Sequence, residues 1–184
     1  MSFKYLLITP ALFLVSCAAM NQMAGLGVVH EGASQFDGSK TVTATPNFVV
    51  GSSVMLGAFY SSMTPGYASM IAKYSSSTGG YGAPLYVSFS GVSINIDGEI
   101  KSFKVTRTDL DSSAYNSVSK QIYTDSSASF VVPISYLRSM VNASDCRIRF
   151  ETSKGSYVGE FHREINGGVP VAKATMKEFL AKLP

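Results

Sequence analysis

The strongest constraint on the fold is a run of alternating apolar and polar residues over residues 85–109, LYVSFSGVSINIDGEIKSFKVTRTD. Apolar side chains at every second position are typical of a half-buried β-strand. Gly91 shifts the phase of the alternation, and Asp97-Gly98 separates two apolar runs. Because glycine accepts the positive φ of a type I′ turn, this dipeptide predicts an antiparallel hairpin. The alternating positions before the turn are Leu85, Val87, Phe89, Val92, Ile94 and Ile96.

Further strands are predicted from β-branched and aromatic runs bounded by turn residues. The run SKTVTATP is expected to end at Pro46, and SSSTGGYGAP, residues 75–84, is the clearest loop signal. The uneven spacing of Ile100 and Phe103 predicts a bulge in the return strand of the hairpin. Other expected strands cover residues 54–62, 67–74 (where a short helix also fits), 121–124, 128–134 and two stretches joined at 153–155.

Two helices are predicted from apolar residues that recur on one face. The first lies near residues 135–143, where Ser135 can cap the N-terminus. The second follows Pro170, a residue suited to a first helical turn. The expected apolar positions are Leu137, Met140 and Val141 in the first helix, and Val171, Ala174, Met176, Phe179, Leu180 and Leu183 in the second.

This order of elements predicts an α+β fold. We expect a mostly antiparallel sheet or sandwich, with the short helix beside it and the C-terminal amphipathic helix packed on it.

The N-terminus has the layout of a secretory signal, with Lys4 as its only early charge and an apolar run over residues 5–16. A transmembrane helix needs about 20 apolar residues. This run is shorter and is interrupted by Pro10. We therefore expect a segment that is removed rather than one that spans a membrane.

Leu14-Val15-Ser16-Cys17 resembles the lipobox of bacterial lipoproteins. The resemblance implies that Cys17 receives a diacylglyceryl group and that a peptidase cuts between Ser16 and Cys17. The next residue is Ala18, not the Asp associated with inner-membrane retention, so the resemblance implies lipid anchoring in the outer membrane, facing the periplasm. An ordinary signal peptide cleaved near Ala18 is the alternative. Two or three acyl chains would hold a protein almost permanently, whereas one gives marginal binding.

This interpretation divides the chain into a signal peptide over residues 1–16, a lipidated cysteine and tether over 17–35, and one β-rich domain over 36–184. If flexible, the 18 residues after Cys17 would span about 25 Å on average, and about 60 Å fully extended. Loss of Lys4 leaves 14 Lys and Arg against 12 acidic residues, a formal charge of +2. So small and scattered a charge argues against nucleic acid as a partner.

Motifs for catalysis or metal binding are weak in this chain. Cys146 alternates with charged residues in DCRIRFET, so we expect a buried structural thiol rather than a nucleophile. His30 and His162 lack a cluster of further ligands, so no metal and no cofactor is expected. Ser117 and Lys120 form an S-x-x-K match without the partner motifs of the penicillin-binding signature.

Aromatic residues gather around the predicted loop, and Tyr67, Tyr74 and Tyr81 beside small residues are candidates for a recognition patch. Tyrosine provides contact area at low conformational entropy. The alternative is that these aromatics belong to the core and the sheet edges.

Three functions fit these features. The first is a non-catalytic binding or scaffolding lipoprotein whose partners are the membrane, through Cys17, and another envelope protein. The second is a periplasmic carrier or sensor of a small apolar ligand. The third is an envelope hydrolase, which would need a cleft that brings together Asp109, Asp111, Glu160 and His162.

Overall fold

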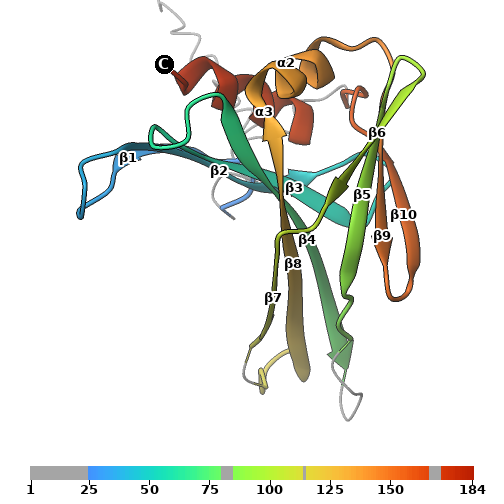
Figure 1. Ribbon diagram of the computed structural model, residues 1–184. Coiled ribbons are helices and arrows are strands. Elements are labelled where there is room, and N and C mark those ends of the chain that lie inside the picture. The colour runs from blue at the N-terminus through green and yellow to red at the C-terminus, as the bar shows by residue number, and fades with distance from the viewer. Residues whose placement is uncertain (1–24, 80–84, 114, 166–170) are drawn as a thin grey trace, which may run out of the picture.

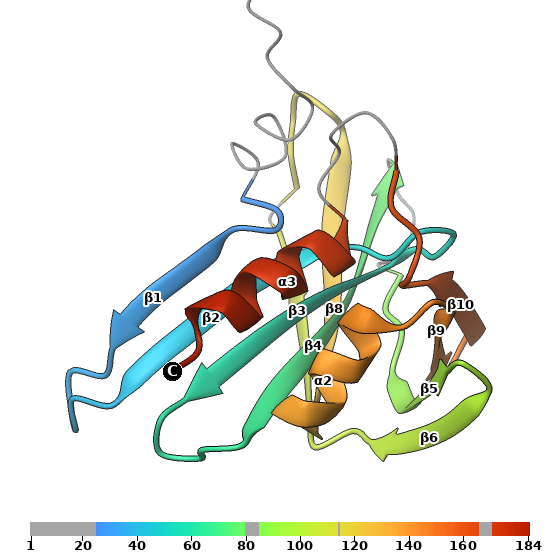
Figure 2. The same cartoon turned by 90° about the horizontal axis from the view of Figure 1, so that it is seen from above.

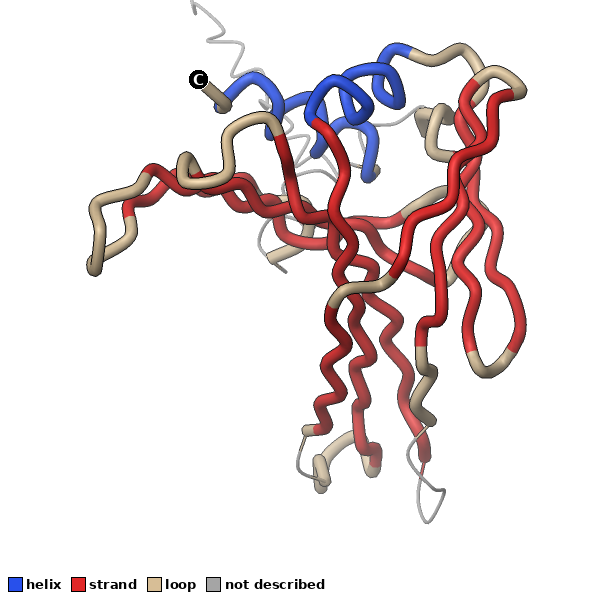
Figure 3. The backbone as a smooth tube through the Cα atoms, viewed as in Figure 1, coloured by secondary structure: helices blue, strands red, loops and turns tan. Residues whose placement is uncertain are grey.

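Two antiparallel sheets and two helices make up the computed structural model, which describes residues 25–79, 85–113, 115–165 and 171–184 (Figures 1 and 3). The α+β fold with a mostly antiparallel architecture is as predicted. The six-stranded sheet has the order β1 (Val29–Ala33), β2 (Lys40–Phe48), β3 (Val54–Ser61), β4 (Tyr67–Gly79), β8 (Gln121–Pro133) and β7 (Arg107–Ser112). The four-stranded sheet has the order β10 (Gly155–Glu160), β9 (Cys146–Thr152), β5 (Phe89–Ile96) and β6 (Glu99–Lys104).

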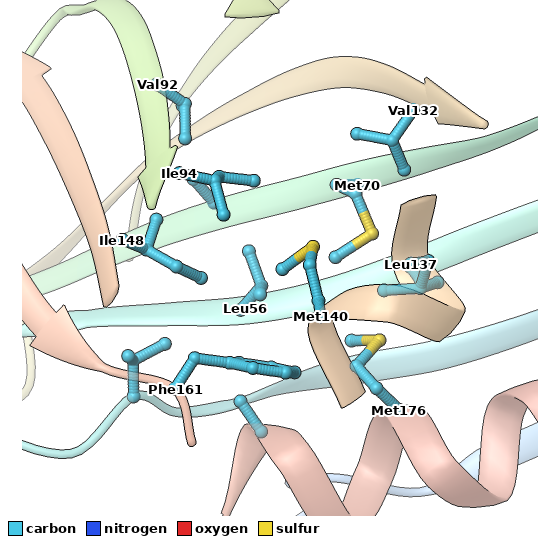
Figure 4. Close-up of a cluster of buried hydrophobic side chains, with 14 of the residues drawn as sticks. Leu56, Met70, Val92, Ile94, Val132, Leu137, Met140, Ile148, Phe161 and Met176 are labelled. Atoms are coloured by element: carbon cyan, nitrogen blue, oxygen red, sulfur yellow. The ribbon is translucent and has the colours of Figure 1, made fainter. Parts of the chain in front are cut away.

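The helices α2 (Ile134–Asn142) and α3 (Ala172–Lys182) lie on the same side of the six-stranded sheet (Figure 2). The C-terminal helix α3 packs on β2 and β3, as expected from its apolar stripe. The second sheet covers the rest of that face. Side chains from both sheets and both helices meet in one core (Figure 4), among them Leu56, Met70, Ile94, Met140, Ile148, Phe161 and Met176.

The predicted hairpin is confirmed at Asp97-Gly98, where both residues have positive φ, 49° and 98°. The Gly91 phase shift coincides with a register shift between β5 and β9 at Phe89 and Gly91. The predicted bulge in the return strand is wrong, because β6 pairs with β5 without interruption. Ile100 faces outward and Phe103 faces the core, so their odd spacing reflects two faces of one strand.

Pro46 does not end its strand, contrary to the prediction. Strand β2 continues to Phe48 through a register shift between Ala44 and Asn47. Proline has no N–H for the ladder and is tolerated at such an irregularity. Gly57 on the neighbouring strand permits the close approach, since a Cβ there would lie 2.8 Å from the Ala44 carbonyl oxygen and 3.0 Å from the Pro46 nitrogen.

The loop expected at residues 75–84 is partly strand. Residues 75–79 continue β4 and pair with β8, and the Ser75 hydroxyl lies 2.6 Å from Asp125 Oδ1. The backbone of these residues pairs with β8 in a long ladder, which local composition does not reveal. Residues 80–84 lie outside the described residues.

The domain also starts earlier than residue 36. Residues 29–33, expected in the tether, form β1 and pair with residues 40–44 of β2. The Gly- and Met-rich composition around β1 does not indicate a strand. The strand forms because it pairs with β2, which follows it in the chain.

The cap predicted for α2 is wrong, whereas its buried face of Leu137, Met140 and Val141 is confirmed. The helix starts at Ile134, whose amide donates to the Gly66 carbonyl at 2.9 Å, and Ser135 makes no cap. In α3, Thr175 is buried in place of the expected Ala174. The Asn47 side-chain amide donates to the Thr175 hydroxyl at 3.0 Å, which satisfies both groups.

Candidate functional site

The face of the six-stranded sheet that points away from the helices carries the candidate site. The strand register aligns one residue from each of five strands across this face, namely His30, Thr43, Phe59, Ser69 and Val131. On β2, β3, β4 and β8, a residue adjacent to each of these points its side chain into the core and is buried. These residues are Ala44, Ala58, Met70 and Phe130. Because successive side chains of a strand point to opposite faces, exposed and core residues alternate along the same strands.

A pocket of about 480 Å³ opens on this face. Its apolar surface comes chiefly from Phe59, Tyr67 and Val131, which are all exposed. Hydroxyl groups complete the lining, and no charged side chain contributes. The lining residues are Phe59, Ser61, Thr64, Tyr67, Ala68, Ser69 and Val131.

The turn between β3 and β4 forms one rim of the pocket. Ser61 Oγ accepts a hydrogen bond from the Met63 amide at 3.3 Å, and the Thr64 hydroxyl donates to the Ser61 carbonyl at 3.4 Å. Gly66 has a φ of 88°, which glycine adopts at little cost, and its carbonyl accepts the first amide of α2. These contacts join the rim to the helix, so the pocket is built on ordered elements.

The chemistry of the pocket suits binding of an uncharged ligand. Apolar and aromatic surface with a few hydroxyl groups is typical of ligand pockets, and the volume falls within their usual range. A general acid or base needs a group whose pKa lies near the working pH. Apart from the Tyr67 phenol, the lining has no titratable side chain.

The three tyrosines proposed as a recognition patch do not form one surface. Tyr67 is 53% exposed and lines the pocket. Tyr74, seven residues along β4, points to the other face, where its ring lies 5.4 Å from that of Tyr157. Tyr81 lies outside the described residues. An odd separation on one strand puts two side chains on opposite faces, which corrects the grouping of Tyr67 with Tyr74.

Sequence reasoning missed the main partners of Tyr67 in the pocket. Val131 lies on β8, far from Tyr67 in the sequence, whereas Phe59 lies on β3, the strand just before β4, and the ladder brings the three side chains together. The period-two pattern of each strand places Phe59 and Val131 opposite their core neighbours. The sequence offers no signal for the register between strands, so it cannot show that these residues meet.

The groups required for the hydrolase hypothesis are dispersed. Asp109 lies on β7 and is bound by Arg107 at 2.9 Å. His162 follows β10 of the other sheet, where its Nδ1 lies 3.1 Å from the Cys146 carbonyl oxygen and 3.3 Å from Asp145. Glu160 pairs with Arg163 at 3.2 Å. Within the part of the chain that the structure describes, no group of three or more His, Cys, Asp or Glu residues is placed to hold a metal ion.

Shifted pKa values occur away from the pocket. Burial raises the pKa of the Cys146 thiol to about 12, and burial raises the pKa of Tyr136 to about 12. The pKa of Glu31 is lowered by hydrogen bonds from Lys182 and Lys40. Cys146 is fully buried, which confirms the structural thiol expected from its strand pattern.

Ser16 and Cys17, the expected cleavage and lipidation residues, lie outside the described residues. Among the residues that are described, neither helix has the length and hydropathy needed to cross a bilayer.

Comparison with known proteins gives no relative: no family model matches the chain, and no match was found among curated proteins or solved structures.

Proposed function

We propose that this chain is a lipid-anchored cell-envelope lipoprotein that acts as a non-catalytic binding or scaffolding module at the outer membrane. The lipobox-like sequence ending at Cys17 supports the anchor and the location, with the domain facing the periplasm. The observation that carries the binding role is the neutral pocket lined by Phe59, Tyr67 and Val131. Exposed apolar side chains that converge on one face are typical of recognition surfaces.

The test compares three proteins expressed in a Gram-negative host fed with a palmitate analogue. They are the wild type, Cys17→Ser, and a pocket variant with Phe59→Ser and Tyr67→Ser. We expect the wild type to carry label and to recover the same envelope component after cross-linking and solubilisation. The pocket variant should carry label but lose that component, because both changed side chains lie on the exposed face of the sheet and outside the buried core.

Two results would refute the proposal. Equal labelling of the wild type and Cys17→Ser would remove the anchor. Equal recovery of the envelope component by the wild type and the pocket variant, or recovery of none by either, would remove the binding role of the pocket.

A second candidate is a carrier of a small apolar ligand, which the pocket volume of about 480 Å³ favours. A native mass spectrum separates the two functions. A small molecule that leaves with the wild type and is lost from the pocket variant would favour the carrier over the scaffold.

A further inference from the structure

The outer face of the four-stranded sheet carries a second pocket, separate from the neutral pocket of the six-stranded sheet. Ile94 and Ile148 point from this sheet into the core, so the side chains next to them along each strand point outward. Figure 1 shows the sheet at the side of the molecule opposite β1. The pocket has a volume of about 200 Å³. Pockets for whole small molecules begin at roughly 300 Å³, so this one fits an end group of a ligand.

Two arginines of β9, Arg147 and Arg149, line this pocket. Residues two apart on a strand are separated by about 7 Å, so one small group can contact both guanidinium groups. Arg147 Nε lies 3.1 Å from Asp145 Oδ1, and Arg149 Nη2 lies 3.0 Å from Glu151 Oε1. A guanidinium has more N–H donors than one carboxylate can accept. Both arginines therefore keep donors for a ligand.

The residues opposite the arginines on β5 are polar as well. The strand register places Asn95 opposite Arg147 and Ser93 opposite Arg149. Asn95 Oδ1 accepts a hydrogen bond from the Gly98 amide at 2.9 Å, which leaves the Nδ2 group of this side chain to donate. The described residues that line the pocket include no carboxylate. The pocket therefore presents hydrogen-bond donors to a ligand, an arrangement that suits an anion.

Exposed apolar side chains flank these donors. Ile100, opposite Asn95 on β6, is 67% exposed, and Val158, opposite Arg149 on β10, is 52% exposed. Both side chains line the pocket. Apolar surface with a few convergent polar groups is typical of ligand pockets, in which the polar groups fix the orientation of the ligand. The pocket therefore suits an anion that is attached to an apolar body.

The charges on this face nearly cancel. The two arginines are balanced by the carboxylates that they contact. Glu160 on β10 pairs with Arg163 at 3.2 Å. Lys104 on β6 and Asp97 at the turn after β5 add one charge of each sign. Because the surplus of positive charge is small, a singly charged anion fits this face better than a doubly charged phosphate.

We infer that this face binds a small organic monoanion, namely a carboxylate that carries a short aliphatic or aromatic group. Arg147 and Arg149 hold the carboxylate between them through charge-assisted hydrogen bonds, with Asn95 Nδ2 as a further donor. Ile100 and Val158 contact the apolar body. The site lies on the other sheet from the neutral pocket, so the inference depends neither on that pocket nor on the lipid anchor.

Fluorine NMR of the full-length protein in a nonionic detergent tests the inference. The probe is para-trifluoromethylphenylacetate, its neutral amide is the matched ligand, and broadening of the probe signal relative to detergent alone gives the affinity. The test variant combines Arg147→Gln with Arg149→Gln, and the control variant is Arg107→Gln. Arg107 is also exposed on a strand and pairs with Asp109 at 2.9 Å, but its strand β7 carries no second arginine.

We expect the wild type to bind the acid at least about tenfold more tightly than the amide, because hydrogen bonds to a charged group are the stronger ones. The double variant should lose this preference and bind the acid about tenfold more weakly or worse, whereas Arg107→Gln should bind it as the wild type does. Ile100→Ser keeps both arginines and should weaken binding of the acid severalfold, through lost apolar contact. Circular dichroism checks the fold of each variant.

Equal affinity of the wild type and the double variant for the acid overturns the inference. Equal affinity of the wild type for acid and amide, or no broadening at millimolar probe, overturns it as well. Tighter binding of the corresponding phosphonate would overturn the assignment to a monoanion. If the acid is lost from the variant with Phe59→Ser and Tyr67→Ser but not from the double arginine variant, the ligand belongs to the neutral pocket and the inference is wrong.

Discussion

Cys146 combines complete burial with a thiol pKa raised to about 12 by the loss of solvation. A thiol reacts as the thiolate, so its chemistry depends on how much of it is deprotonated. At neutral pH almost none is. The side chain therefore serves as a small apolar group in the core, and the backbone of its residue is held by Phe161, whose amide donates to the Cys146 carbonyl at 2.8 Å.

In Cys17→Ser, Cys146 is the only cysteine, since the chain has two. We expect its thiol to react with an aromatic disulfide reagent at least about a thousandfold more slowly in the folded protein than in urea, because about three pKa units separate the two states. Stopped-flow absorbance measures both rates. Rapid labelling of the folded protein would contradict the burial of this thiol.

At the scale of elements, the register shift of β2 depends on a glycine in the neighbouring strand. A Cβ on Gly57 would meet backbone atoms of Ala44 and Pro46, which cannot move aside like the end of a side chain. Gly91 offers a comparison in another irregular strand, because a Cβ there would lie 3.5 Å from Glu151 Oε2, an ordinary contact.

Gly57→Ala is expected to lower the free energy of unfolding by about 1–3 kcal/mol, the usual cost of overpacking a well-packed site. Gly91→Ala, by contrast, should change it little. Urea unfolding followed by circular dichroism compares the two variants with the wild type. Equal stabilities of the two variants would show that the strands can separate at Gly57 without loss.

The sequence predicted most elements because their cues are local. The residues that indicate the turn at Asp97-Gly98 are neighbours in the sequence, and so are those that form the apolar face of α2. It failed at β1, at residues 75–79 and at Pro46, where the deciding contacts are made with another strand, the next one along the chain for β1 and Pro46 and a distant one for residues 75–79. The pocket has the same origin, since Phe59, Tyr67 and Val131 meet through the register of β3, β4 and β8.

At the scale of the whole molecule, both sheets and both helices share one core. Met140 is fully buried in it, beside residues of each sheet (Figure 4). A core shared in this way couples the two sheets, so we expect one cooperative unfolding transition.

Met140→Ala is expected to destabilise the protein by about 2–5 kcal/mol, through lost burial and the cavity left behind. Native-state hydrogen exchange should show the most protected amides of β3 and of β9 losing the same amount of protection. A loss confined to one sheet would mean that the sheets unfold independently. Arg138→Ala, on the exposed side of the same helix, is the control.

The alternation of pocket and core residues along β3 and β4 has a consequence for how this protein can change. Phe59 lies between the buried Ala58 and Tyr60, and Ser69 is followed by the buried Met70, so residues of the pocket lining and of the interior are neighbours along both strands. The pocket lining can change through point replacements on the outside while the interior stays as it is. A one-residue insertion or deletion in either strand would instead turn the lining inward and the interior outward, so natural variation in these strands should consist of exchanges at constant length.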